Sequence, residues 1–152
     1  MNRVRRLEPI KELAERKERQ AAQTFGQSQQ ILEAARKGLT SLHEFRQNYS
    51  EQFQASATQG LGIRRLQEYR AFLDKINKAI VDQEKRVQQA EREVDNKKRN
   101  WEAARAHLLG LQTVVDKLRG EALKQDQKRE QSEQDDRAGR RSGDKTLLSL
   151  FL

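Results

Sequence analysis

Residues 66–125 read LQEYRAFLDKINKAIVDQEKRVQQAEREVDNKKRNWEAARAHLLGLQTVVDKLRGEALKQ. Apolar side chains recur in this segment at intervals of three and four residues, which places them on one face of an α-helix. The first position of each seven-residue repeat, from Leu66 to Ala122, is apolar throughout. Few globular helices keep such a repeat for so long, so the segment predicts a coiled coil with a left-handed supercoil.

The composition also favours long helices over a compact domain. Of the 152 residues, 36% are charged and 34% are hydrophobic, with a single proline and eight glycines. Abundant Ala, Glu, Lys, Arg and Gln at heptad spacing is typical of coiled coils rather than of a core that contains a sheet. We therefore expect an all-α fold.

The chain is basic, with 31 Lys and Arg against 23 Asp and Glu and a net charge of +8. Such an excess could attract nucleic acid, anionic lipid or an acidic protein surface. However, carboxylates are interspersed with the basic residues, whereas phosphate-binding proteins cluster their positive charge. We interpret most of the charge as a solvated helix surface and expect no nucleic acid.

Three further absences bear on the compartment. The sequence has no cysteine, which excludes disulfides and fits a reducing cytoplasm. The basic start is followed by Leu7, Glu8 and Pro9 rather than by an apolar run, so no secretory signal is predicted. No apolar stretch is long enough for a membrane span, and we expect a soluble protein.

Two glycines mark the one clear break in the body of the chain. Gly60 and Gly62 flank Leu61, and glycine permits the positive φ that ends a helix. Because the connection is short, the helices are expected to form an antiparallel two-helix coiled-coil hairpin with unequal arms. The predicted parts are a basic leader over residues 1–8, helix one over 9–57, a turn over 58–62, helix two over 63–136 and a flexible tail over 137–152. The hairpin is expected to be monomeric, and a dimer of two long bent helices is the alternative.

The apolar stripe of helix one is broader than that of helix two. One register contains Ile10, Ala14, Ala21, Ile31, Ala35, Leu42, Phe45 and Tyr49. A second set lies one residue off this stripe and widens it, namely Leu13, Phe25, Leu32, Leu39 and Phe53. A stripe this broad suits a helix that packs on one neighbour and keeps apolar surface in reserve.

The apolar row of helix two continues where the predicted helix one has ended. If residues 57 and 63 face each other, Ile10 lies opposite Gly110. Leu111, Val115 and Leu118 then continue the row without a partner. An exposed apolar row is costly in water, so it predicts a docking surface. The alternative is that the leader folds back and covers part of the row with Val4 and Leu7.

The C-terminal part turns polar. Residues 125–134 have no apolar side chain, and residues 137–143 are rich in Arg and Gly, a composition typical of disorder. The chain closes with Leu147, Leu148, Leu150, Phe151 and Leu152. This end is interpreted as part of a disordered tail, with a docking motif as the alternative.

The sequence has none of the motifs that an enzyme or a metal site requires. His43 and His107 have no second histidine one helical turn away, and no cysteine is present, so no zinc site is predicted. There is no glycine-rich phosphate loop and no nucleophile elbow. We predict no enzyme, no cofactor and no metal.

Aromatic residues gather on both sides of the predicted turn. Phe45, Tyr49 and Phe53 precede the turn, and Tyr69 and Phe72 follow it. Antiparallel pairing brings the two groups together. Phe72 stands beside the seam, where coiled coils usually carry charge. Such a cluster is a candidate hot spot for a partner, although the rings could instead thicken the local core.

This layout resembles the flagellar export protein family FliJ over about residues 10–138. The resemblance rests on Leu42-x-x-Phe45-x-x-x-Tyr49, on Tyr69-x-x-Phe72-Leu73-x-x-Ile76-x-x-Ala79-Ile80, on Trp101 in the middle of helix two, and on the stretch from Gln127-Lys128 to Asp136. Three features depart from the family pattern. Gln83 stands where a histidine can occur, Ser132 and Gln134 dilute the C-terminal acidic run, and the Leu-rich end is unusual for the family.

The resemblance implies a cytoplasmic component of the flagellar type III export apparatus, shaped like the central stalk of a rotary ATPase. The end with both termini would enter the ring of the export ATPase FliI, with Leu111, Val115 and Leu118 as ring-binding residues. The opposite end would bind the export-gate membrane protein FlhA and hold the protein at the cytoplasmic face of the inner membrane. The implied gate-binding residues are Leu42, Phe45, Tyr49, Phe72, Ile76, Ala79 and Gln83. Export chaperones are further implied partners.

The implied mechanism is mechanical coupling between the ATPase and the gate in support of flagellum biogenesis and motility. A competing interpretation of the same residues is a basic coiled-coil scaffold that binds nucleic acid or anionic membrane. Salt-sensitive binding to arbitrary DNA or to anionic vesicles would favour that alternative.

Overall fold

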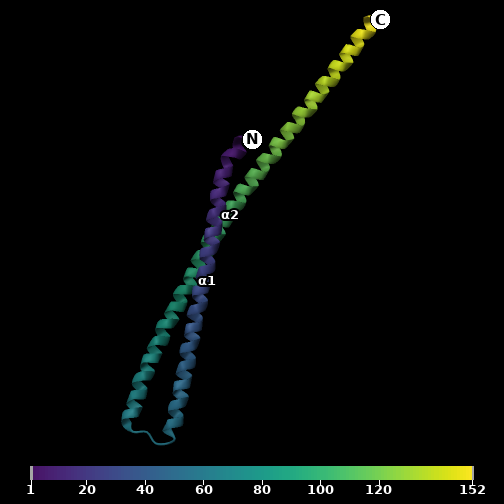
Figure 1. Ribbon diagram of the computed structural model, residues 1–152. Helices are drawn as coiled ribbons and strands as arrows, with labels where there is room; N and C mark the ends of the chain where they lie inside the picture. Colours follow the sequence, from purple (N-terminus) through teal and green to yellow (C-terminus); the bar gives the residue numbers. More distant parts are fainter. Residues whose placement is uncertain (1, 152) are drawn as a thin grey trace. The chain divides into compact units, whose positions relative to one another are not determined.

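The computed structural model describes residues 2–151, and it describes the side chains of residues 2–142. Two helices account for nearly all of this part of the chain, α1 (Asn2–Ala57, 56 residues) and α2 (Ile63–Phe151, 89 residues) (Figure 1). No strand occurs among the described residues. The helices pack against each other as a hairpin, so the predicted all-α coiled-coil fold is confirmed.

The connection between the helices is closed by short backbone hydrogen bonds. The amide of Gln59 donates to the carbonyl of Ser56 at 3.1 Å, and the amide of Gly60 donates to Ala57 at 3.2 Å. Gly60 has a φ of 84°, in the left-handed region that side chains with a Cβ disfavour. This glycine therefore ends α1 and lets the chain reverse.

The contacts divide the chain into two compact units. The first, here called the hairpin unit, contains residues 17–104 and includes the turn. The second, here called the end unit, combines residues 1–16 with residues 105–152. The hairpin unit has its main core at Leu32, Val87 and Ala90, which are all buried.

The seam of α1 in the hairpin unit differs from the predicted one. Leu32 is buried and Leu39 packs against it, whereas Ile31 is 63% exposed and Phe45 is 51% exposed. The prediction that Ile31 and Phe45 face the seam was therefore wrong. The observed seam combines Phe25, Leu32 and Leu39 of the second set with Ala35 of the first, which packs against the same core. Ile10, in the end unit, is likewise 48% exposed.

The end unit begins with helix where the sequence predicted a leader. Residues 2–8 belong to α1, and Pro9 lies inside the helix. Val4 is buried, Ala14 is buried, and Val115 on α2 is fully buried. Burial of apolar area stabilises this additional helical segment. Arg119 also pairs with Glu8 across the two helices.

The apolar row of α2 is consequently covered. Val115 is fully buried, and Leu111 and Leu118 are half-buried. The expectation of an unpartnered row was wrong. The alternative, in which the leader folds back, agrees with the structure because Val4 and Leu7 contribute to the covering helix.

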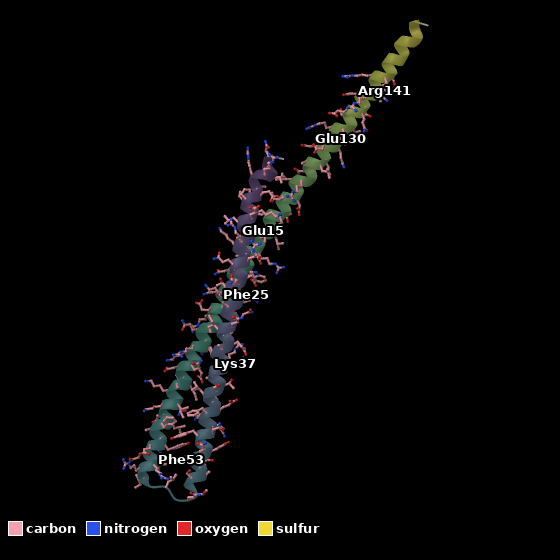
Figure 2. The ribbon with its side chains drawn as sticks, viewed as in Figure 1. Glu15, Phe25, Lys37, Phe53, Glu130 and Arg141 are labelled. Carbon is pink, nitrogen blue, oxygen red and sulfur yellow. The ribbon has the colours of Figure 1, made fainter. Side chains whose placement is uncertain are left out.

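Helix α2 continues past the predicted end at residue 136 and runs to Phe151. The side chains of Glu130 and Arg141 project from it (Figure 2) and are exposed. Helix-forming Ala, Arg, Glu and Gln residues sustain a solvated helix of this kind. The predicted Leu-rich end, residues 147–152, lies outside the side chains that the structure describes.

Candidate functional site

Five aromatic rings from the two helices form a cluster at the turn end of the hairpin unit, here called the aromatic cluster. Its members are Phe45, Tyr49, Phe53, Tyr69 and Phe72. The ring centroids of Phe53 and Tyr69 are 3.6 Å apart with planes at 11°. Those of Tyr49 and Phe72 are 4.7 Å apart. The prediction that antiparallel pairing brings these rings together is confirmed.

The cluster has an inner and an outer part. Tyr49, Phe53 and Tyr69 are half-buried, and the hydroxyl of Tyr69 donates to the Oγ of Ser50 at 3.3 Å. Phe45 and Phe72 are 51% and 39% exposed, with their rings in an edge-on contact at 6.2 Å. Two large apolar rings in contact with each other and with solvent form a surface suited to a partner.

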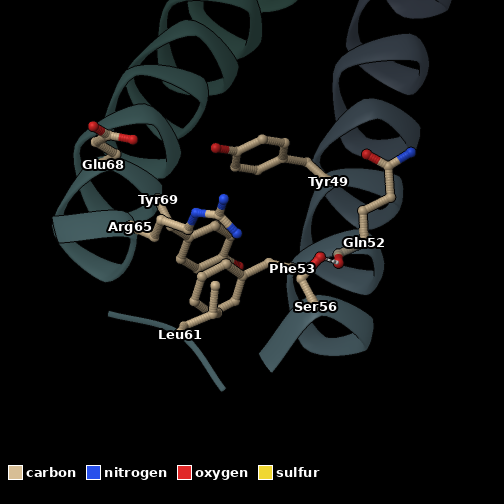
Figure 3. A pocket seen from close by; sticks show the side chains of 8 residues that line it. All are labelled: Tyr49, Gln52, Phe53, Ser56, Leu61, Arg65, Glu68 and Tyr69. Carbon is tan, nitrogen blue, oxygen red and sulfur yellow. Dashed lines mark hydrogen bonds between the residues drawn. The ribbon is translucent and has the colours of Figure 1, made fainter. Parts of the chain in front are cut away.

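An open pocket of about 300 Å³ lies between the inner rings and the turn. Figure 3 shows the stacked rings of Phe53 and Tyr69 at its floor, with Tyr49 above them. The guanidinium of Arg65 reaches toward these rings, and Glu68 borders the pocket from the same helix. The arrangement is suited to contact with an apolar side chain and offers one charge of each sign at its rim.

Some of the predicted gate-binding residues lie on the surface of the structure, and others lie in its core. Phe45 and Phe72 are exposed. Leu42, Tyr49, Ala79 and Gln83 are half-buried. Ile76 is only 5% exposed, so it packs in the seam between the helices and is not part of the exposed surface.

Gln83 has a structural contact of its own. Its Nε2 donates to the backbone carbonyl of Ala35 at 3.0 Å. Gly38 lies so near that a Cβ there would stand 2.9 Å from this nitrogen. The absence of a side chain at residue 38 therefore makes room for a polar group of α2 at the seam.

The predicted ring-binding residues lie in the end unit. Val115 has no exposed area, and Leu111 and Leu118 are half-buried against α1. Leu118 also lines an open groove of about 570 Å³ with Arg3 and Val4. These residues thus hold the two helices together, and only the edges of Leu111 and Leu118 reach solvent.

Sequence reasoning missed three exposed apolar residues of the end unit. Leu109, Val114 and Leu123 are 50%, 47% and 60% exposed. They are apolar residues outside the two heptad positions that form the seam. Their place in the heptad could have identified them as exposed apolar residues. Trp101 of the hairpin unit, in contrast, fills the seam. Its ring is tilted by 33° against that of Phe25 with the centroids 5.8 Å apart, and its Nε1 donates to Glu18 at 3.0 Å.

Neither a metal site nor a membrane span is found in the described part of the chain. No group of three His, Cys, Asp or Glu residues there could hold a metal ion. Within residues 2–151, neither helix contains a stretch apolar enough to cross a bilayer.

Known proteins match the chain over most of its length. The sequence profile of the family described as Flagellar FliJ protein matches residues 2–146. A flagellar FliJ protein of Salmonella typhi is 25% identical over 134 residues, which cover 88% of this chain and 91% of the relative. A flagellar FliJ protein of Escherichia coli K12 is 24% identical over the same shares. No solved structure matches significantly.

Proposed function

The chain belongs to the flagellar FliJ family, and from this premise we propose that it couples the export ATPase FliI to the export-gate protein FlhA. Membership of the family makes it a component of flagellar protein export and not an enzyme. The family description names no partner, and the proposed partners are inferred from the surfaces of the two units.

The exposed ring pair Phe45 and Phe72 carries the proposal for the gate. These rings are 51% and 39% exposed, they contact each other across the two helices, and Tyr49 contacts both of them. Large rings that a partner can desolvate are typical of binding hot spots. We propose that this surface binds FlhA, and that the binding holds the protein at the cytoplasmic face of the membrane.

We further propose that the ATPase ring binds the end unit. Because Val115 is fully buried, its role would be to hold α1 and α2 together. The ring would contact the outer edges of Leu111 and Leu118 together with the surface of α1 that covers them. The proposed site is therefore a two-helix surface rather than a single exposed row.

The proposed mechanism is mechanical. Each helix is continuous through residues of both units, so nucleotide-driven changes of the ring would shift packed helices that also present the gate-binding surface. Close packing resists continuous deformation and transmits such a displacement. Export chaperones would bind as additional partners of the same component.

Two binding measurements test the coupling role. The purified chain should retain FliI in a pull-down, with a yield that differs between nucleotide-free and nucleotide-bound ATPase. The Phe72→Ala variant should keep FliI binding and lose binding to the cytoplasmic domain of FlhA. Retention of FlhA by Phe72→Ala and Phe45→Ala alike would overturn the proposed gate surface, and no retention of FliI under any nucleotide would overturn the coupling role.

A further inference from the structure

One face of the hairpin unit carries an α1 strip without charge, here called the uncharged strip. Its members recur every three and four residues and are Gln20, Thr24, Gln27, Ile31, Ala34, Gly38, Ser41, Phe45, Asn48 and Gln52. Each is exposed or half-buried. In a chain of which 36% is charged, an uncharged solvent face of this length is unexpected for a freely solvated helix.

The opposite face of the same unit has the usual charge. Arg36 pairs with Glu91 at 3.6 Å across the helices, and Glu84 and Lys98 lie along the same edge of α2. The lack of charge is therefore confined to one side of the hairpin unit and is not a property of its overall composition.

A groove runs beside the uncharged strip. It has a volume of about 420 Å³ and is lined by Ile31 and Ala35 of α1 and by Ala90 of α2. Ile31 is 63% exposed, while Ala34, the next member of the strip, has only a methyl side chain. Small residues next to one large apolar residue allow another helix to approach closely.

The α2 edge of this face carries charges of alternating sign, Lys75, Asp82, Arg86 and Glu93. If a second copy lay antiparallel on the face, Lys75 would face Glu93 of the second copy, and Asp82 would face Arg86 of the second copy. Two-fold symmetry repeats both pairs. A shift by one heptad would instead oppose Lys75 to Arg86 or, in the other direction, Asp82 to Glu93. The charges therefore favour a single register.

The same register suits the uncharged strip. Because Gln83 of α2 contacts Ala35 of α1, a two-fold axis at residue 84 of α2 lies near residue 36 of α1. The register then places Ile31 against Ser41 of the second copy and Phe45 against Gln27 of the second copy, so that larger side chains meet smaller ones. Complementary volumes of this kind permit close packing between helices.

We propose that this face is an interface between two copies of the chain, which associate antiparallel into a four-helix bundle over their hairpin units. From Gln20 to Gln52 the strip is about 48 Å long, and two helices are about 20 Å wide. The contact then covers roughly 1,000 Å² on each copy, which is in the range of specific interfaces. Because much of it is polar, the dimer is weak and forms at raised concentration, and the dilute chain is a monomer.

The interface overlaps the surface assigned above to the gate, a consequence that rests on the proposed function. Phe45 and Phe72 belong to both. Self-association and gate binding therefore exclude each other, so the dimer keeps the exposed rings covered until the gate is reached.

Sedimentation equilibrium of the full chain, from about 1 to 300 μM, tests the interface without any partner. We expect a monomer–dimer equilibrium that Lys75→Glu weakens about tenfold, since it creates two like-charge contacts per dimer. The double variant Lys75→Glu with Glu93→Lys should restore it. These residues are about five helical turns apart on α2, so they can compensate each other only between copies.

The matched control is Lys98→Glu, the same charge change on the opposite face, which should leave the dimer constant unchanged. Ile31→Lys should abolish the dimer while circular dichroism retains its helical signal. A chain that stays monomeric over the whole range overturns the proposal, as does a double variant no better than Lys75→Glu. Loss of FlhA binding by Ile31→Lys in a strictly monomeric chain would assign the strip to a helix of a partner instead.

Discussion

Gln83 of α2 is hydrogen-bonded to the backbone of Ala35 of α1, with 3.0 Å between its Nε2 and the carbonyl oxygen. The contact passes directly over Gly38, where a Cβ would lie 2.9 Å from the same nitrogen. A polar side chain at a seam position is acceptable because its donor finds a partner. The glycine provides the space in which the bond forms.

This relationship predicts unequal effects of glycine replacement. A helical Gly→Ala change stabilises by up to ~1 kcal/mol where space is free, and nothing lies within 4 Å of a Cβ at Gly26. Gly26→Ala should therefore raise the free energy of unfolding. Gly38→Ala should gain far less, because its methyl displaces the Gln83 amide and costs about 1 kcal/mol of hydrogen bonding.

Urea unfolding followed by circular dichroism measures both changes. The control is Gly38→Ala in a Gln83→Ala background, where the clash is gone and the full helical gain should return. Equal stabilisation by Gly26→Ala and Gly38→Ala in the natural background would contradict the predicted contact.

The seam of α1 predicts opposite outcomes for two adjacent residues. Leu32 is 8% exposed and Ile31 is 63% exposed. Leu32→Ala removes a core side chain next to Val87 and Ala90 and should cost ~2–4 kcal/mol. Ile31→Ala should change the free energy of unfolding by less than ~0.5 kcal/mol. Thermal or urea unfolding of the two variants compares them directly, and similar losses would contradict the observed register.

The difference between these neighbours also shows how far the sequence alone can be interpreted. Helix α2 has one apolar row, so the burial of Ile80, Val87 and Val115 follows from their spacing. Helix α1 has two overlapping rows, and spacing cannot distinguish Ile31 from Leu32. The choice depends on how side chains of α2 fill the space opposite them, which only the packed structure contains.

The same limit applies to the candidate site and to the end unit. Antiparallel pairing predicted that Phe45 and Phe72 would meet, but which rings face solvent depends on the side of the seam they occupy. Pro9 favoured a helix start because proline suits a first turn. In the structure α1 nevertheless begins at Asn2, because the burial of Val4 against α2 outweighs this local preference.

The aromatic cluster predicts separate roles for two residues of one helix. Phe72→Ala should reduce FlhA binding at least tenfold while the helical signal is unchanged, because the ring is 39% exposed and gains burial only in a complex. Ile76→Ala should instead lower stability by ~2–4 kcal/mol, since its side chain is buried. Isothermal titration and urea unfolding separate the two effects. Val81→Ala, 48% exposed away from the rings, is the control that should change neither.

The packing of the end unit predicts that substitutions at two residues distant in sequence have the same effect. Val4 of α1 and Val115 of α2 are both buried, so an aspartate at either position would leave a charge in an apolar contact. Val4→Asp and Val115→Asp should each release residues 2–8 from α2 at a cost of ~3 kcal/mol or more. Hydrogen exchange should rise over residues 2–16 in both variants and remain unchanged over residues 63–90.

Ring binding should follow the same pairing. If FliI binds the two-helix surface, Val4→Asp and Val115→Asp should weaken FliI retention to a similar extent, although the two residues lie on different helices. Val81→Asp is the matched control, because its side chain is 48% exposed and lies in the hairpin unit, so an aspartate there leaves residues 2–16 of α1 in place. Full retention of FliI by Val4→Asp, with the exchange of residues 2–16 raised, would show that the ring binds α2 alone.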